Sequence, residues 1–320
     1  MSAYEIVDFH GHWFPPGVVS RRPAATATPA LARRWELLTD LDAQLEAASA
    51  AGTDVKVVNA VYSTVAPAAE VPLDELPARV NDALADAVAR HDGRLAALAT
   101  VDAFRGDAGA EEARRAVEQL GLPGIVVDAA QGELLLSAPQ ARPTLAYCAE
   151  RGIPVFAHPV NPPQLPQRYA DVGGAGVLLA RGSESALSTL SLLASGTIAE
   201  LDGLQLVLAG IAGAALLLAN FLDAEDAERP LASTGRSRLT IDTMGFDPAA
   251  TRFALDLLGP EQVVVGSDWP IMWRDASRER VERMLAQAGA DAETSALVAG
   301  GNARRLLALR RTRSSAAALR

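Results

Sequence analysis

Cysteine is almost absent from the chain: Cys148 is the only one among 320 residues. A single thiol excludes an internal disulfide and any zinc site built from cysteines. Cys148 follows Leu145 and Ala146 in an apolar helical pattern, so we expect a small core residue rather than a nucleophile. Histidine is also scarce, with four residues, and aromatic residues make up 5% of the chain. Chemistry that depends on imidazole therefore rests on very few positions.

An excess of positive charge is also missing, because 39 acidic residues outnumber 29 basic ones and the formal net charge is -10. This balance argues against a protein that binds nucleic acid, which needs a basic surface. The segment Met1–Glu5 has neither the basic nor the apolar region of a secretory signal, so we expect a cytoplasmic protein. We expect no association with a membrane.

One apolar run, Leu206–Leu222, comes close to the length that spans a bilayer. It contains Gly210, Gly213 and Asn220 and lacks flanking charges. A buried strand, a tight turn and a helix explain this run better than a membrane span does.

What the chain does contain is a large apolar fraction, 49%, and a regular alternation of two patterns. Short runs rich in Val, Ile, Leu and Ala are typical of buried parallel strands. Eight such runs occur, at Glu5–Phe9, Val55–Ala60, Leu95–Val101, Gly124–Asp128, Ile153–His158, Leu204–Ala209, Arg238–Thr243 and Gln262–Gly266. Helical patterns lie between most of them, at Trp35–Ala51, Asp74–Arg90, Ala110–Leu120, Pro139–Arg151, Ala212–Asp223 and Pro248–Leu258.

This order predicts an α/β fold, and eight strands are the number that closes a (β/α)8 TIM-type barrel. An open, doubly wound sheet is the alternative, but no G-x-G-x-x-G follows the first strand. We expect a single domain over residues 1–309 and a flexible C-terminal tail over residues 310–320. The Pro- and Gly-rich segment Asn161–Glu184 predicts a long loop insertion after strand five that shapes the substrate pocket.

Three of the four histidines lie where predicted strands end. His10 and His12 are two residues apart, so their side chains point to the same side of the first strand. His158 ends the fifth strand, and Asp268 follows the eighth. Catalytic residues of a barrel gather at these strand ends, and imidazoles with a carboxylate are ligands of catalytic metal ions. The fourth histidine, His91, lies near a helix end, where we expect a capping or surface role.

With these residues in view, the chain resembles the amidohydrolase superfamily, in particular the branch of aminocarboxymuconate-semialdehyde decarboxylase and related aromatic-acid decarboxylases and hydrolases. The similarity spans nearly the whole chain. It rests on D-x-H-x-H-x-x-P at Asp8–Pro15, on G-S-D-W-P at Gly266–Pro270 and on the closing Gly301–Leu306.

The resemblance implies that His10, His12, His158 and Asp268 bind a divalent metal ion. We expect zinc first, with iron or manganese as alternatives, and one or two ions per chain. In one respect the chain departs from the family, which usually carries a histidine after strand six in a segment like L-A-H-G-G-G. Gly210 stands at that position here.

Several other residues are candidates for the site. Asp128 ends strand four, where relatives with two metals often place a bridging carboxylate. We therefore weigh Asp128 as an extra ligand or catalytic base against an ordinary capping acid, and we expect Asp268 to act in catalysis. Candidate substrate-binding residues near the predicted barrel mouth are Trp13, Phe14, Trp269 and Asn161. Loop arginines that could bind a carboxylate are Arg33, Arg34 and Arg168.

The metal site predicts an enzyme acting on a small molecule, and hydrolysis is the first interpretation. In it, a metal-activated water cleaves an ester, thioester or amide of a small organic substrate. The alternative is a non-oxidative decarboxylase of an aromatic or unsaturated acid, which the missing strand-six histidine disfavours. A metal-binding homologue without activity is the third hypothesis. We also expect a homodimer, which is common for barrels of this size.

Overall fold

The computed structural model describes residues 4–20, 29–91, 93–162, 170–225, 237–272 and 274–309. All eight predicted strands are present, the third as two consecutive segments. Their bounds are β1 (Val7–His12), β3 (Val55–Asn59), β5 (Leu95–Ala97), β6 (Ala99–Thr100), β7 (Ile125–Asp128), β10 (Pro154–His158), β11 (Gln205–Leu208), β12 (Leu239–Asp242) and β13 (Val263–Val264). Neighbouring strands pair in parallel throughout this set.

The strands close into a barrel. Their order runs β1-β3-β5 in one sheet and β6-β7-β10-β11-β12-β13 in the other, and β5 and β6 join the two sheets as parts of one strand. Beyond β13 the chain returns to β1, because the Phe9 amide donates to the Val265 carbonyl at 2.8 Å and the Asp268 amide to the His10 carbonyl at 2.7 Å. The predicted barrel is confirmed, and the open-sheet alternative is wrong.

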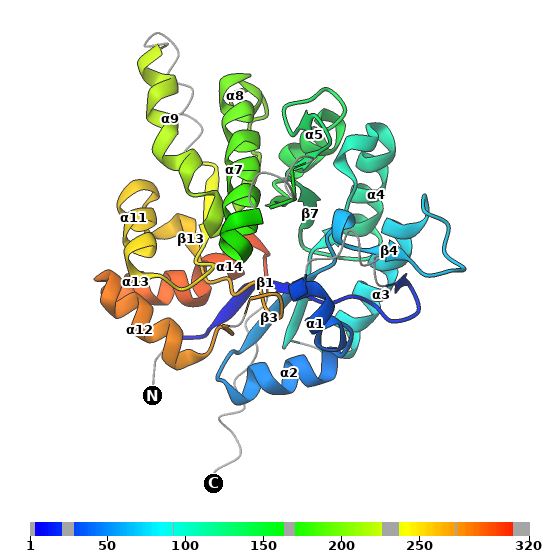
Figure 1. Cartoon of the computed structure of the whole chain (residues 1–320), viewed down its shortest axis with the longest axis horizontal. Coiled ribbons are helices and arrows are strands. Elements are labelled where there is room, and N and C mark those ends of the chain that lie inside the picture. Colours follow the sequence, from blue (N-terminus) through cyan, green and yellow to red (C-terminus); the bar gives the residue numbers. More distant parts are fainter. Residues whose placement is uncertain are drawn as a thin grey trace.

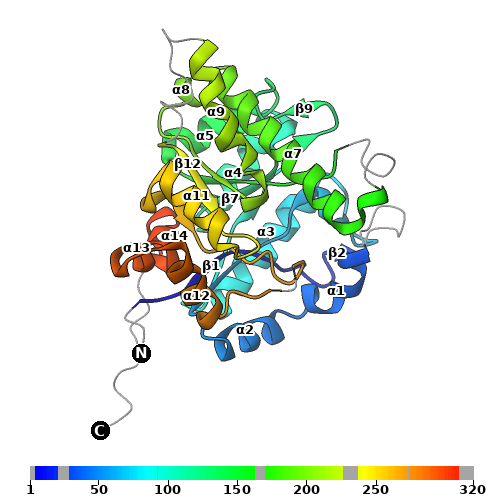
Figure 2. The same ribbon diagram turned by 60° about the vertical axis from the view of Figure 1, so that its left-hand side comes forward.

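Helices surround the strands (Figures 1 and 2). The helices are α1 (Pro29–Thr39), α2 (Leu41–Ala50), α3 (Leu76–Arg90), α4 (Asp107–Glu118), α5 (Arg142–Arg151), α7 (Gly173–Ala194), α8 (Thr197–Glu200), α9 (Ala214–Glu225), α11 (Pro248–Leu258), α12 (Arg278–Ala288), α13 (Ala292–Ala296) and α14 (Asn302–Leu306). Single helical turns are η1 (Tyr62–Thr64), η2 (Ala103–Arg105), η3 (Ala170–Val172), η4 (Gly210–Ala212), η5 (Pro260–Gln262) and η6 (Leu297–Gly301). Two short antiparallel pairs join β2 (Val19–Ser20) to β4 (Ala66–Pro67) and β8 (Ala130–Gln131) to β9 (Leu134–Leu135).

Alternation along the strands sorts side chains between two cores. Val55 and Val57 of β3 belong to the cluster inside the barrel, together with Phe156 of β10, whereas Val58 faces the helices. Since side chains alternate with a period of two, Asn59 and His158 continue the inward rows at the carboxyl ends of their strands. The last inward-facing residue of each of these two strands is therefore polar and lies at the mouth of the barrel.

The segment after strand five differs from the prediction. Instead of a loop from Asn161 to Glu184, helix α7 begins at Gly173 and runs to Ala194. Glycine lowers helix propensity, but here Gly182 is needed for packing: a Cβ atom at this position would lie 2.3 Å from the carbonyl oxygen of Ile211. A close approach to η4 therefore explains a glycine that looked like a loop residue.

The apolar run Leu206–Leu222 contains the end of β11, the turn η4 and most of α9, as the strand, turn and helix interpretation predicted. Among the described residues, no helix has the length and apolar character needed to cross a membrane. The predicted domain of residues 1–309 stays a prediction, and the tail at 310–320 lies outside the described residues.

Candidate metal centre

Four buried side chains converge at the carboxyl ends of three strands. His10 and His12 come from β1, His158 from β10, and Asp268 from the loop that follows β13. Each offers a ligand atom, and these atoms all lie within 4.8 Å of one another. Asp268 Oδ1 lies 2.9 Å from His12 Nε2 and 3.4 Å from His10 Nε2. Three imidazoles and one carboxylate at this spacing are a donor set for a divalent ion.

The end of β1 is shaped to present its histidines. Pairing of β1 with β3 shifts register between Asp8 and Gly11, at the point where the imidazoles begin. Glycine suits position 11, since a Cβ atom would lie 3.0 Å from the Val57 carbonyl oxygen and 2.8 Å from Lys56 Nζ, which is paired with Asp8. The bulge-like irregularity and the glycine together bring both imidazoles into the mouth.

Asp242 at the end of β12 orients His10. Its Oδ2 lies 2.7 Å from His10 Nδ1, and its Oδ1 accepts hydrogen bonds of 2.8 Å from the backbone amides of Gly210 and Met244. If Nδ1–H donates to this carboxylate, Nε2 of the neutral ring carries the lone pair. Among the described residues, this buried Nε2 has no hydrogen-bond partner, and it faces the other three residues of the group. The residues therefore fit a metal ion.

The charges of the group match that interpretation. Burial lowers the pKa of His12 and, helped by the neighbouring histidines, lowers that of His158 well below its usual value. Burial alone would raise the pKa of Asp268, but His10 and His12 outweigh it and the pKa falls. Burial opposes protonation of His10 too, yet Asp242 and Asp268 raise its pKa. Neutral His12 and His158 beside an ionised carboxylate are the forms that bind metal.

A buried network behind the group fixes the Asp268 loop to β1. Asp8 accepts hydrogen bonds from the Ser267 amide at 2.9 Å and the Ser267 hydroxyl at 2.7 Å, and from Lys56 Nζ at 3.1 Å. Asp268 itself has a backbone φ of 56°, in the left-handed region that few residues other than glycine adopt. Strained backbone of this kind persists where the surroundings hold it and is common at functional sites.

Asp128, a predicted extra ligand or base, lies next to His158 in the sheet register but outside the group of four. Its carboxylate accepts hydrogen bonds from Ser63 in η1, at 2.6 Å from the hydroxyl and 3.1 Å from the amide. This contact ties η1 to the mouth of the barrel. A catalytic role for Asp128 stays a prediction.

The predicted substrate-binding residues lie in different surroundings. Trp13 and Phe14 are buried in the outer core, where Phe14 packs on Trp35 with ring centroids 5.7 Å apart. Trp269 is half-buried beside Arg34, whose guanidinium carbon lies 5.4 Å from the ring centroid. Asn161 is exposed. Substrate contact by these residues stays a prediction, and Arg168 lies outside the described residues.

Two polar residues near the mouth were not predicted. Asn59 ends β3 in register with His12, and neither polar atom of its buried amide has a hydrogen-bond partner among the described residues. Arg181 extends from α7, and its Nη2 donates to the Pro159 carbonyl at 2.6 Å. A polar residue closing an apolar strand run was the available signal for Asn59. No signal identified Arg181, because its segment was assigned to a loop.

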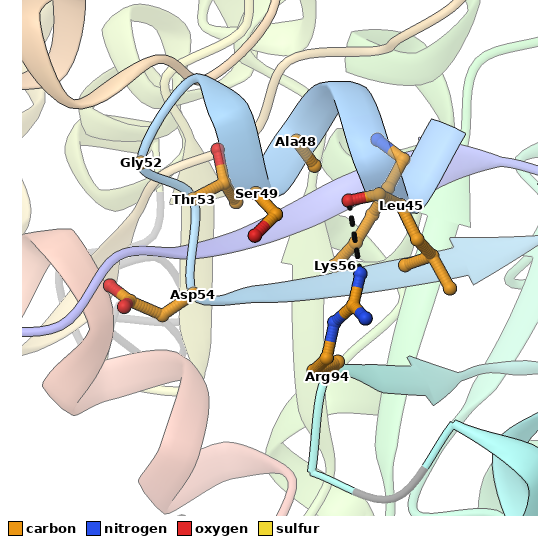
Figure 3. A pocket seen from close by; sticks show the side chains of 8 residues that line it. All are labelled: Leu45, Ala48, Ser49, Gly52, Thr53, Asp54, Lys56 and Arg94. Atoms are coloured by element: carbon orange, nitrogen blue, oxygen red, sulfur yellow. Dashed lines mark hydrogen bonds between the residues drawn. The ribbon is translucent and has the colours of Figure 1, made fainter. Parts of the chain in front are cut away.

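A pocket elsewhere on the barrel does not compete with this site. It lies where α2 meets the start of β3, and Asp54, Lys56 and Arg94 line it, with Arg94 donating to the Leu45 carbonyl at 3.2 Å (Figure 3). The amino-terminal face of a barrel usually serves stability rather than catalysis.

Fold and site together define a metal-dependent enzyme built on an α/β barrel. The chain belongs to the amidohydrolase family, whose pattern it matches over residues 7–309. The gamma-resorcylate decarboxylase of Rhodococcus jostii (strain RHA1) is 29% identical over 240 residues, which cover 68% of this chain and 73% of that protein. The 2-amino-3-carboxymuconate-6-semialdehyde decarboxylase of Dictyostelium discoideum is 24% identical over 208 residues, covering 61% of this chain and 56% of that protein.

The fold is similar to that of a solved decarboxylase as well. A 5-carboxyvanillate decarboxylase from Novosphingobium aromaticivorans, in complex with manganese and 4-hydroxy-3-methoxy-5-nitrobenzoic acid, superposes with a TM-score of 0.78. It is 18% identical, and the match covers 96% of this chain and 98% of that one. The relatives in sequence, not the similar fold, confirm the predicted decarboxylase branch of the superfamily.

The first functional interpretation, a hydrolase of esters, thioesters or amides, is wrong. Each of the three similar proteins is a decarboxylase. The absence of a histidine at Gly210 does not exclude decarboxylation, because the group of His10, His12, His158 and Asp268 is complete without it.

Proposed function

We propose that this chain is a non-oxidative decarboxylase of an aromatic carboxylic acid. The observation that carries the proposal is the buried group of His10, His12, His158 and Asp268 in a chain that aligns with 73% of a gamma-resorcylate decarboxylase. Relatives that act on gamma-resorcylate and 5-carboxyvanillate support a hydroxybenzoate as the substrate class.

The reaction requires one proton and no oxidant. A proton bonds to the ring carbon that bears the carboxylate, the carbon–carbon bond breaks, its electron pair returns to the ring, and carbon dioxide leaves. The divalent ion, when bound, supplies positive charge that holds anionic oxygens of the acid.

Asp268 is the residue we assign to carry the proton: its carboxylate is ionised in the free site, takes up a proton from solvent and passes it to the ring carbon. Its Oδ1 lies 2.9 Å from His12 Nε2 and 3.4 Å from His10 Nε2, and its loop is fixed by the hydrogen bonds of Ser267 to Asp8. His10 cannot deliver its Nδ1 proton to a substrate, because that proton is held by Asp242 at 2.7 Å. Burial of the group excludes water that would otherwise compete for the proton.

The identity of the metal is part of the proposal. Zinc was the expectation from the sequence, whereas manganese is the ion in the 5-carboxyvanillate decarboxylase structure. Loading the metal-free chain separately with each ion and comparing turnover distinguishes them, and we expect the higher rate with manganese.

The test of function is release of carbon dioxide. The metal-loaded chain is incubated with 2,6-dihydroxybenzoate, 5-carboxyvanillate and other 2-hydroxybenzoates, and carbon dioxide and the decarboxylated phenol are quantified. We expect equal amounts of the two products from at least one acid, and a fall of about 10²–10⁴ in rate for Asp268→Asn. Absence of carbon dioxide from the whole panel with a fully loaded site would refute the proposal.

A further inference from the structure

Helix α7 brings a positive charge to the metal centre from outside the barrel strands. Its residue Gly182 packs so closely on η4 that no Cβ atom fits. This contact fixes the position of α7 relative to the turn that follows β11. Arg181 immediately precedes Gly182, and its Nη2 donates to the carbonyl of Pro159, the residue after His158. In Figures 1 and 2, α7 stands beside α9 at this end of the barrel.

The surroundings of Arg181 show that its charge acts on the site. Its guanidinium interacts electrostatically with Asp268 and Asp128, and it helps to lower the pKa of His12 and His158. Within the described part of the chain, however, no carboxylate forms an ion pair with it, and its hydrogen-bond acceptor there is the Pro159 carbonyl. A guanidinium has five N–H donors in a fork that suits a carboxylate. A half-buried arginine without an ion-pair partner is therefore suited to an anionic ligand.

The position of Arg181 relates to the missing histidine. The family histidine after strand six would stand at Gly210, where a Cβ atom would lie 2.9 Å from the Asp242 carbonyl oxygen. Gly210 begins the turn η4, and η4 is the element on which α7 packs. The chain thus lacks an imidazole at this edge of the mouth and carries an arginine from the helix packed against it.

We propose that Arg181 binds the carboxylate of the aromatic-acid substrate and sets the preference of this site for acids over neutral phenols. The inference rests on the proposed function for the nature of the ligand. It concerns binding, so a failure to decarboxylate does not by itself overturn it.

Calorimetric titration of the manganese-loaded chain tests the proposal with a matched pair of ligands, 2,6-dihydroxybenzoate and resorcinol, which differ by the carboxylate. If the acid is consumed during titration, its KM and the inhibition constant of resorcinol replace the two dissociation constants. For Arg181→Met we expect the dissociation constant of the acid to rise about 10- to 100-fold, because a charge-assisted hydrogen bond is lost, and that of resorcinol to change less than about twofold. Arg79→Met removes an exposed arginine of α3 and should leave both constants unchanged.

Arg181→Lys keeps the positive charge but not the forked arrangement of N–H donors. It replaces Arg181→Met in the test if that variant fails to fold. We expect it to weaken binding of the acid by a smaller factor, again without an effect on resorcinol. Equal weakening of both ligands, or no weakening of either, in variants with normal metal content would overturn the role of Arg181. If the wild type binds the acid through Arg181 but releases no carbon dioxide, the proposed function fails while this inference stands.

Discussion

At the scale of single residues, the four candidate ligands were predictable and their neighbours were not. His10, His12, His158 and Asp268 stand at strand ends in the sequence, and parallel strands place those ends at one face of a barrel. Asn59 and Arg181 escaped prediction because their relevance depends on which way a side chain points and on which helix covers the mouth. Neither property follows from local sequence.

Asp242 is the residue whose removal tests the orientation of His10. Asp242→Asn weakens the hydrogen bond to His10 Nδ1 and allows the tautomer of His10 that carries its proton on Nε2. We therefore expect metal affinity to fall about 10- to 100-fold. Competition with a chromogenic chelator measures this affinity. Asp256→Asn, at an exposed position of α11, serves as the control and should bind metal like the wild type. Unchanged affinity in Asp242→Asn would mean that the contact at 2.7 Å does not position the ring.

Cys148 provides a second test at this scale. The thiol is fully buried in α5, and burial raises its pKa to about 12. At pH 8 the thiolate, which is the reactive form, is therefore scarce, and reagent access is blocked as well. We expect no alkylation of the native chain by iodoacetamide over an hour and complete alkylation in denaturant, as measured by mass spectrometry. Rapid modification of the native chain would contradict the assignment of Cys148 to the core.

At the scale of elements, strands were easier to predict than helices. Buried strands are short and uniformly apolar, so composition alone reveals them. The segment Asn161–Glu184 predicts a loop because it is rich in Pro and Gly, yet α7 begins within it at Gly173. Tertiary packing against η4 is what makes Gly182 suitable there.

Substitution of glycines within α7 tests this packing. For Gly182→Ala the new Cβ atom meets the backbone of Ile211, so we expect the free energy of unfolding to fall by about 1–3 kcal/mol. Gly174→Ala is the matched control in the same helix, since nothing lies within 4 Å of its Cβ position. That variant should be unchanged or more stable by about 0.5–1 kcal/mol. Denaturant unfolding measures both, and equal stability of the two variants would place α7 farther from η4.

At the scale of the whole molecule, closure of the barrel is what brings the two ends of the sequence together. Strand β1 contacts the segment that follows β13 through two backbone hydrogen bonds. The Phe9 amide donates to the Val265 carbonyl, and the Asp268 amide donates to the His10 carbonyl. The alternation of strands and helices predicted this closure, and with it the metal site. The predicted homodimer and the division at residue 309 stay predictions.

The most direct test of the account is the metal content of the purified chain, reloaded with manganese and dialysed, in the wild type, in His12→Asn and in His91→Asn. We predict about one equivalent of manganese per chain in the wild type and in His91→Asn. The His91 side chain does not belong to the group of four, and its Nε2 lies 3.4 Å from Asp42 Oδ1. His12→Asn should lose most of the ion while its circular dichroism stays that of a folded protein. The same metal content in His12→Asn as in the wild type would contradict the four-residue centre on which the proposed chemistry rests.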